Sequence, residues 1–161
     1  MPHSLSQSQF ILADPARVWD YFSTPSNLDA LTPPKMEFRI MGEPGPMHEG
    51  QLISYRIRVA PAIWVNWLTE IRRVDEGRCF VDEQRIGPYR FWYHEHTFEP
   101  RDGGVLMYDH VTYALPLGLL GELAHALWVR RQLKYIFDYR RTAVERLFGN
   151  SKPSAEPRIA G

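Results

Sequence analysis

Two histidines that could do chemistry, His94 and His96, are separated by one residue, and Asp109 follows them. If residues 102–103 form a two-residue turn, the flanking segments pair so that His96 lies opposite Asp109. An imidazole beside a carboxylate is a pairing used by general bases, and it is also an ordinary way to satisfy two buried polar groups. His96 and Asp109 are therefore candidates for a catalytic base or for a ligand-binding donor, with a purely structural hydrogen bond as the alternative.

The same register groups a mostly apolar set of residues with the two histidines. Because side chains alternate along a strand, one face is expected to look into the interior and the other, with Tyr93, Glu95 and His110, toward solvent. We expect the inward face to line a cavity in which the imidazoles and Asp109 are the polar groups. The residues expected to contact a bound molecule are His94, His96, Asp109, Trp92, Tyr113, Trp67, Tyr55, Phe98, Met107, Val111, Leu133 and Phe137.

A metal ion is a further interpretation of these side chains. His94, His96 and Asp109 could direct two nitrogens and one oxygen to a common point. The same arrangement arises in ordinary strands, and the sequence offers no evident fourth ligand. The prediction is therefore no metal site and no cofactor.

Composition narrows the function classes. With 19 basic and 19 acidic residues the formal net charge is zero, which removes the bulk field that would attract nucleic acid or an anionic membrane. Five Trp, eight Tyr and eight Phe make 13% of the chain, so we expect either an aromatic core or an aromatic-lined cavity. The single cysteine, Cys79, excludes an intramolecular disulfide and has no evident basic partner to make it a nucleophile. No signal peptide or long apolar run is visible, so the expected location is the cytoplasm.

The elements that must position these residues follow from the spacing of apolar side chains. Asp14 and Pro15 are typical of a helix N-terminus, and Pro25 ends that helix. A second short helix is predicted over Asn27–Leu31. The turn at 87–89 leaves the faces of Asp82 and Gln84 undecided. Seven strands are predicted, over Ser4–Leu12, Met36–Ile40, Ile53–Val59, Ile63–Ile71, Cys79–Arg85, Phe91–Glu99 and Val105–Leu115.

Apolar residues at steps of three and four predict one long helix from Leu119 to Phe148. Its basic residues, including Arg140, are expected on a solvated face. The preceding segment, Leu117–Gly121, is interpreted either as a gate at the cavity mouth or as close packing of helix on sheet. Residues 1–149 are expected to form one domain and residues 150–161 a disordered tail.

The predicted fold class is α+β. A curved antiparallel sheet of seven strands wraps around the long C-terminal helix, and two short helices lie between the first and second strands. A strongly bent sheet does not close tightly on a straight helix, so space is left between them.

This order of elements, with several local phrases, resembles the START-like or SRPBCC superfamily, which has the helix-grip fold. The resemblance covers about residues 3–149 and is similar to a bacterial single-domain branch with relatives among the subunits of carbon monoxide dehydrogenase. It implies a cavity for lipids, sterols, polyketides or plant hormones, and it supplies no catalytic residues. The phrases are DPARVW at 14–19, FVDEQ at 80–84, GPY at 87–89, WYHEHTF at 92–98 and DHVTYALPLG at 109–118.

The function expected from these observations is binding of a small hydrophobic or aromatic molecule, such as a lipid, quinone or polyketide, between sheet and helix. One alternative is a cyclase or dehydratase that uses His96 and Asp109 as a general base. Another is a protein-interaction module without a ligand. The expected partner is a small hydrophobic ligand, with no nucleic acid and no stable membrane insertion, and homodimerisation is left open.

Overall fold

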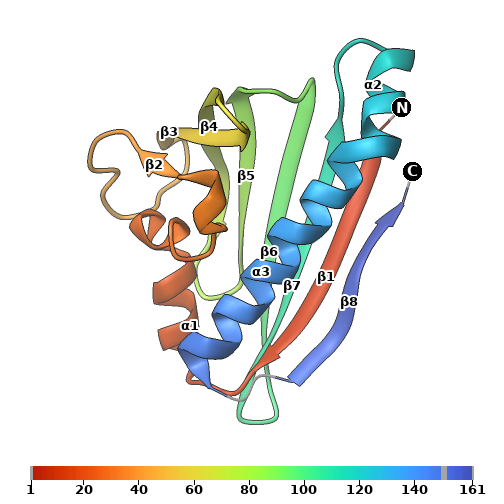
Figure 1. Ribbon diagram of the computed structural model, residues 1–161. Coiled ribbons are helices and arrows are strands. Elements are labelled where there is room, and N and C mark those ends of the chain that lie inside the picture. The colour runs from red at the N-terminus through yellow and green to blue at the C-terminus, as the bar shows by residue number, and fades with distance from the viewer. Residues whose placement is uncertain (1, 150–151, 161) are drawn as a thin grey trace.

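The computed structural model describes residues 2–149 and 152–160. A large sheet and a long helix dominate it, and the helix runs across one face of the sheet (Figure 1). The strands are β1 (His3–Ile11), β2 (Arg39–Ile40), β3 (Leu52–Ala60), β4 (Ile63–Asp75), β5 (Cys79–Ile86), β6 (Phe91–Arg101), β7 (Gly104–Ala114) and β8 (Lys152–Ala160). The helices are α1 (Pro15–Phe22), the short 3-10 helices η1 (Pro25–Leu28) and η2 (Pro34–Met36), α2 (Leu119–Ala124), the π-helical turn η3 (His125–Val129) and α3 (Arg130–Phe148).

The strands form one antiparallel sheet in the order β2-β3-β4-β5-β6-β7-β1-β8. The helix-grip architecture and the α+β class agree with the prediction, but the sheet has eight strands instead of seven. The additional strand, β8, lies within the tail predicted to be disordered and pairs with β1, with Ser4 opposite Ala160. Backbone pairing along the open edge of β1 does not require an apolar side-chain pattern, which is why the composition of this segment does not reveal a strand.

The segment between β1 and β3 begins as predicted. Asp14 caps α1, because its Oδ1 accepts from the amides of Ala16 and Arg17 at 2.9 and 3.2 Å. The predicted strand Met36–Ile40 is corrected: Met36 ends η2, and β2 contains two residues. Glu37 has φ 42°, and this left-handed backbone interrupts an extended chain.

The second predicted helix also needs correction. In place of a helix over Asn27–Leu31, the structure has the 3-10 helix η1 at Pro25–Leu28. Proline at the first position fits a helix start, because its ring fixes φ and the missing amide would have had no partner there.

The long helix is continuous from Leu119 to Phe148, but η3 interrupts its regular geometry. The wider π turn places His125 on the sheet-facing side, four residues before Val129. Arg140 also lies on this side and is 8% exposed, so its predicted place on a solvated face is corrected. The apolar residues that pack against the sheet are Val129, Leu133, Phe137 and Val144.

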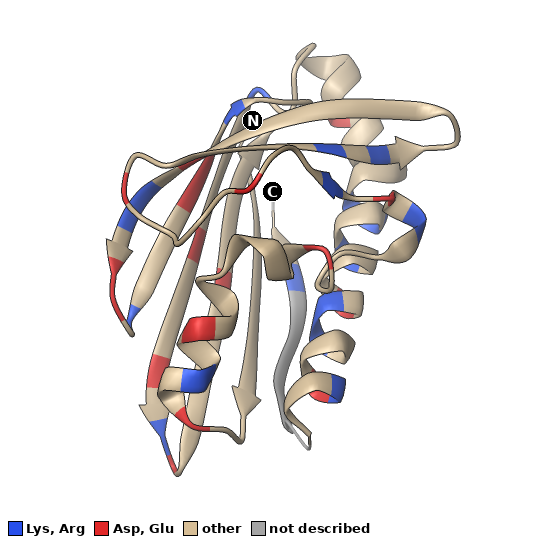
Figure 2. Ribbon diagram, turned by 90° about the vertical axis from the view of Figure 1, so that its left-hand side faces the viewer, with Lys and Arg blue, Asp and Glu red and all other residues tan. Residues whose placement is uncertain are grey.

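The interior contains two apolar clusters. One joins the middle of the sheet to the helix through Phe137 and Leu133, and the other packs α1 against the opposite end of the sheet through Trp19 and Phe98. Figure 2 shows acidic and basic residues interspersed over strands and helices. None of the described helices is long and apolar enough to cross a lipid bilayer.

A buried polar cluster fastens the start of the long helix to the sheet. The ring of His3 stacks on that of His125, with 3.6 Å between centroids. Tyr113 Oη lies 2.8 Å from His125 Nε2, and Glu122 Oε2 lies 3.0 Å from His3 Nε2. Strands β1 and β7 therefore hold α2 and η3 partly through imidazole groups.

This cluster predicts that the start of the helix loosens in mild acid. Burial, the charge of His3 and the charge of Arg130 lower the pKa of His125 below its ordinary value, and Glu122 opposes them. Because the folded-state pKa is the lower one, the stabilisation is present above a pH of about 6.5 and is lost as the pH falls below it. Amide hydrogen exchange in α2 and η3, corrected for intrinsic rates, should therefore accelerate between neutral pH and pH about 5. His125→Gln should flatten this dependence, and equal acceleration in both proteins would contradict the assignment.

Candidate functional site

The β6–β7 hairpin has the predicted register. Arg101 pairs with Gly104, and His96 pairs with Asp109. Asp102 and Gly103 have φ values of 51° and 77°, the two positive values that a type I′ turn requires. The turn thereby sets which side chains of the two strands share a face.

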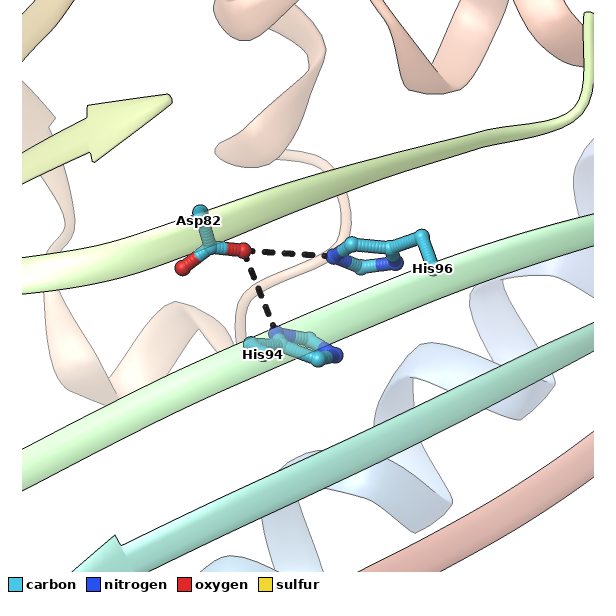
Figure 3. Close-up of side chains that lie close together, drawn as sticks. All are labelled: Asp82, His94 and His96. Carbon is cyan, nitrogen blue, oxygen red and sulfur yellow. Dashed lines mark ion pairs between the residues drawn. The ribbon is translucent and has the colours of Figure 1, made fainter. Parts of the chain in front are cut away.

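Four ionisable side chains meet on the inward face. His94 and His96 come from β6, Asp109 from β7 and Asp82 from β5, where it pairs with His94. His96 Nδ1 lies 2.7 Å and His94 Nε2 3.3 Å from Asp109 Oδ1. On the other side, His94 Nδ1 and His96 Nε2 each lie 3.4 Å from Asp82 Oδ2 (Figure 3). Each imidazole therefore bridges two carboxylates.

Arg140 completes this group from the helix. Its Nη1 lies 4.0 Å from Asp109 Oδ1, and its guanidinium carbon lies 5.0 Å from the centre of the Phe137 ring. The sequence prediction missed Arg140 because an arginine in an amphipathic helix is normally solvated. Asp82, whose face the sequence leaves undecided, is the second residue that the structure adds.

The electrostatics of the cluster separate the two histidines. Burial and the charge of His96 lower the pKa of His94 to about 4, against the pull of the carboxylates. Burial also acts to lower the pKa of His96, but Asp109 and Asp82 outweigh it and raise that pKa. Burial alone would raise the pKa of each aspartate, yet the neighbouring imidazoles and Arg140 hold both below their usual value. The cluster therefore carries unlike histidines held between two ionised carboxylates.

A cavity of about 350 Å³ opens above this cluster, between the sheet and the long helix. Among the described residues that line it, all acidic, basic and imidazole groups belong to the cluster, namely Asp82, His94, His96 and Arg140. The remaining wall is mainly aliphatic and aromatic. Predicted ligand residues that line it are His94, His96, Trp92, Trp67, Tyr55, Leu133 and Phe137.

Five other predicted residues do not line the cavity, which corrects their expected placement. They are Asp109, Tyr113, Phe98, Met107 and Val111. Phe98 and Met107 pack in the second core cluster with α1, because the inward face of the hairpin extends beyond the cavity. Val111 and Tyr113 are 0% exposed within the first cluster, and Asp109 is covered by the two imidazoles.

The remaining sequence candidates have structural positions. Gln84 holds the β5–β6 connection, since its Nε2 donates to the carbonyl of Tyr89 at 2.7 Å. In the segment Leu117–Gly121, Leu117, Leu120 and Gly121 line the cavity. A Cβ on Gly121 would collide with the carbonyl oxygen of Pro116, so this part of the segment is also closely packed.

One wall residue carries an unused donor. Trp67 Nε1 is buried and has no hydrogen-bond partner among the described residues. The ring itself packs at 5.7 Å from Tyr55 and at 5.4 Å from Trp92. A buried indole N–H normally finds an acceptor, so this wall offers a polar contact to a bound molecule.

Comparison with known families identifies this arrangement. Residues 2–145 match the family described as polyketide cyclase / dehydrase and lipid transport. The chain belongs to that family. No curated protein gives a significant match to this member of the polyketide cyclase / dehydrase and lipid transport family.

Solved structures show the same fold. The family member is similar to protein CV1439 from Chromobacterium violaceum, with a TM-score of 0.70, 13% identity and coverage of 91% of this chain and 98% of that one. Protein TTHA0849 from Thermus thermophilus gives a TM-score of 0.64 at 20% identity, with 89% and 94% covered. A truncated norcoclaurine synthase from Thalictrum flavum gives 0.65 at 12% identity, with 93% and 96% covered. At these identities the similarity establishes the fold alone.

Proposed function

We propose that this protein binds one small, largely apolar and aromatic molecule in the cavity between the sheet and the long helix. The observation that carries the proposal is the distribution of chemistry in the wall, which is apolar except for the cluster of Asp82, His94, His96 and Arg140 and a few neutral polar groups. Cavities of about 300–1,000 Å³ lined in this way are typical of small-molecule sites. The present volume, about 350 Å³, favours a molecule at the small end of that range.

The wall explains how affinity and orientation would divide. Burial of about 300 Å² of apolar ligand surface contributes roughly 7 kcal/mol before the costs of association, which limits affinity to the micromolar range. The rings of Tyr55, Trp67 and Trp92 offer faces and edges for a flat ligand. The ionisable cluster and the unused Trp67 N–H select the polar end.

The proposal predicts saturable binding of an uncharged aromatic probe. N-phenyl-1-naphthylamine should gain fluorescence on binding to the full chain at one probe per chain. Ile136 is half-buried on α3 and lines the cavity, so Ile136→Trp should fill the space and weaken binding by about tenfold or more. Fluorescence titration of both proteins measures the change.

The matched control introduces the same ring elsewhere on the same helix. Leu147 is 39% exposed and is not part of the cavity wall, so Leu147→Trp should leave probe affinity unchanged. Circular dichroism melts establish that both variants fold. Equal probe affinity in the wild type and in Ile136→Trp would contradict binding in this cavity.

A further inference from the structure

The ionisable cluster has an open and a closed side. The side chain of Asp109 is 0% exposed and lies behind the two imidazoles, away from the cavity. The side chain of Asp82 is 17% exposed and lines the cavity. The edges of both imidazoles that face Asp82 are therefore the edges nearest the cavity.

The nitrogens of the two rings divide between these sides. His94 Nε2 and His96 Nδ1 approach the same oxygen of Asp109, at 3.3 and 2.7 Å. A neutral imidazole has one N–H and one lone pair. When both N–H groups are donated to Asp109, the lone pairs of His94 Nδ1 and His96 Nε2 both face Asp82. Three electron-pair donors then converge on one small space, which is an unfavourable arrangement without a cation between them.

The spacing of these donors fits a metal ion. Metal–ligand bonds to imidazole nitrogen and carboxylate oxygen are about 2.0–2.2 Å, so the edge of a tetrahedral site is about 3.3–3.5 Å. Asp82 Oδ2 lies 3.4 Å from His94 Nδ1 and 3.4 Å from His96 Nε2. One ligand atom from each of the three side chains lies within 4.8 Å of the others. Figure 3 shows these side chains converging from β5 and β6.

We propose that Asp82, His94 and His96 bind a divalent transition-metal ion of the zinc type at the floor of the cavity. Two imidazoles and one carboxylate are ligands that zinc and ferrous iron accept, and such sites leave positions open for water or an oxygen of a bound molecule. The carboxylate of this site is Asp82, whereas the sequence pattern suggested Asp109. The inference goes beyond the proposed binding function and does not depend on it, since metal affinity is measured without an organic ligand.

Asp109 is a positioning residue in this site. It receives both imidazole N–H groups on its single oxygen Oδ1, which fixes the tautomers and ring orientations that direct the other nitrogens toward the metal. Arg140, 4.0 Å from the same oxygen, supports the buried negative charge from the helix. Carboxylate–histidine–metal chains of this kind are the usual outer support of histidine ligands.

The test uses the full chain after treatment with EDTA and dialysis. Titration with Co²⁺, followed by visible absorption, and with Zn²⁺, followed by calorimetry, should show one ion per chain. Zn²⁺ should also raise the Tm, because it binds the folded state. Asp82→Asn and His96→Gln should each abolish the Co²⁺ bands. Asp109→Asn should weaken affinity by about 10–100-fold and shift the bands while the circular dichroism spectrum stays unchanged.

His110→Gln is the matched control, since His110 is exposed on the outward face of β7. It should bind both metals as the wild type does. If His96→Gln fails to fold, Asp82→Asn decides, because it replaces a partly exposed side chain with one of the same shape. Absence of saturable binding, or equal binding by Asp82→Asn and the wild type, would overturn the inference. Unchanged binding of N-phenyl-1-naphthylamine in the same samples would show that this failure leaves the proposed function intact.

Discussion

Replacing Asp109 with alanine is expected to lower the free energy of unfolding by about 3–5 kcal/mol, the range for removing one partner from a buried ion pair. The side chain of Asp109 is 0% exposed and lies 2.7 Å from His96. Without it, the guanidinium of Arg140, only 10% exposed, loses the carboxylate beside it. Urea denaturation in the presence of EDTA, followed by circular dichroism, measures the loss.

Asp138→Ala provides the comparison. Asp138 is also an ion-pair partner, 2.8 Å from Lys134 Nζ, but its side chain is 35% exposed. Solvated pairs contribute about 0.2–1 kcal/mol, so this variant should lose no more than that. A loss as small for Asp109→Ala would show that the buried cluster does not stabilise the fold. The double variant Asp109→Ala/Arg140→Met should lose less than the sum of the single losses, because the two side chains interact.

Phe137→Ala is expected to cost about 3–5 kcal/mol of unfolding free energy. Phe137 is 1% exposed and lies in the cluster that joins the helix to the middle of the sheet. Its ring packs 5.7 Å from that of His94 and under the guanidinium of Arg140. Truncation would extend an existing cavity that the rigid sheet cannot collapse around, which places the cost in the upper part of the range for such substitutions.

The control for this prediction lies two positions away. Tyr135 is 45% exposed on the same helix, so Tyr135→Ala should change the unfolding free energy by about 0.5 kcal/mol or less. Thermal and urea denaturation of both variants decide the matter. If the two variants lose equal stability, the helix is not held to the sheet through Phe137.

The register of the β6–β7 hairpin is predictable because one short turn determines it. Asp102 and Gly103 suit the positive φ values of a type I′ turn, and every later pair follows by alternation. The position of Asp82 cannot be counted in the same way. The paired part of β5 and β6 ends at Glu83 opposite Tyr93, and the β4–β5 ladder contains register shifts. A bulge exchanges the two faces of a strand, so only the folded chain shows that Asp82 points inward.

Arg140 escapes prediction for a different reason. Its place in the helical period is compatible with the buried face, but the desolvation of a guanidinium normally excludes arginine from that face. The compensating partner, Asp109, lies on a strand distant in sequence. Local pattern identifies the helix, whereas burial of a charged side chain depends on a tertiary contact that periodicity does not contain.

The position of β1 in the sheet has a consequence for how the chain folds. Strands β3 to β7 each pair with a neighbour in sequence, whereas β1 pairs with β7 and β8, so His3 meets Tyr113. During synthesis β1 emerges long before either partner, and its backbone groups stay unpaired until β7 is complete. Contacts of such large sequence separation close slowly and favour folding over milliseconds to seconds. Because α2, η3 and α3 lie between β7 and β8 in the chain, the cavity takes shape only in the last stages of folding.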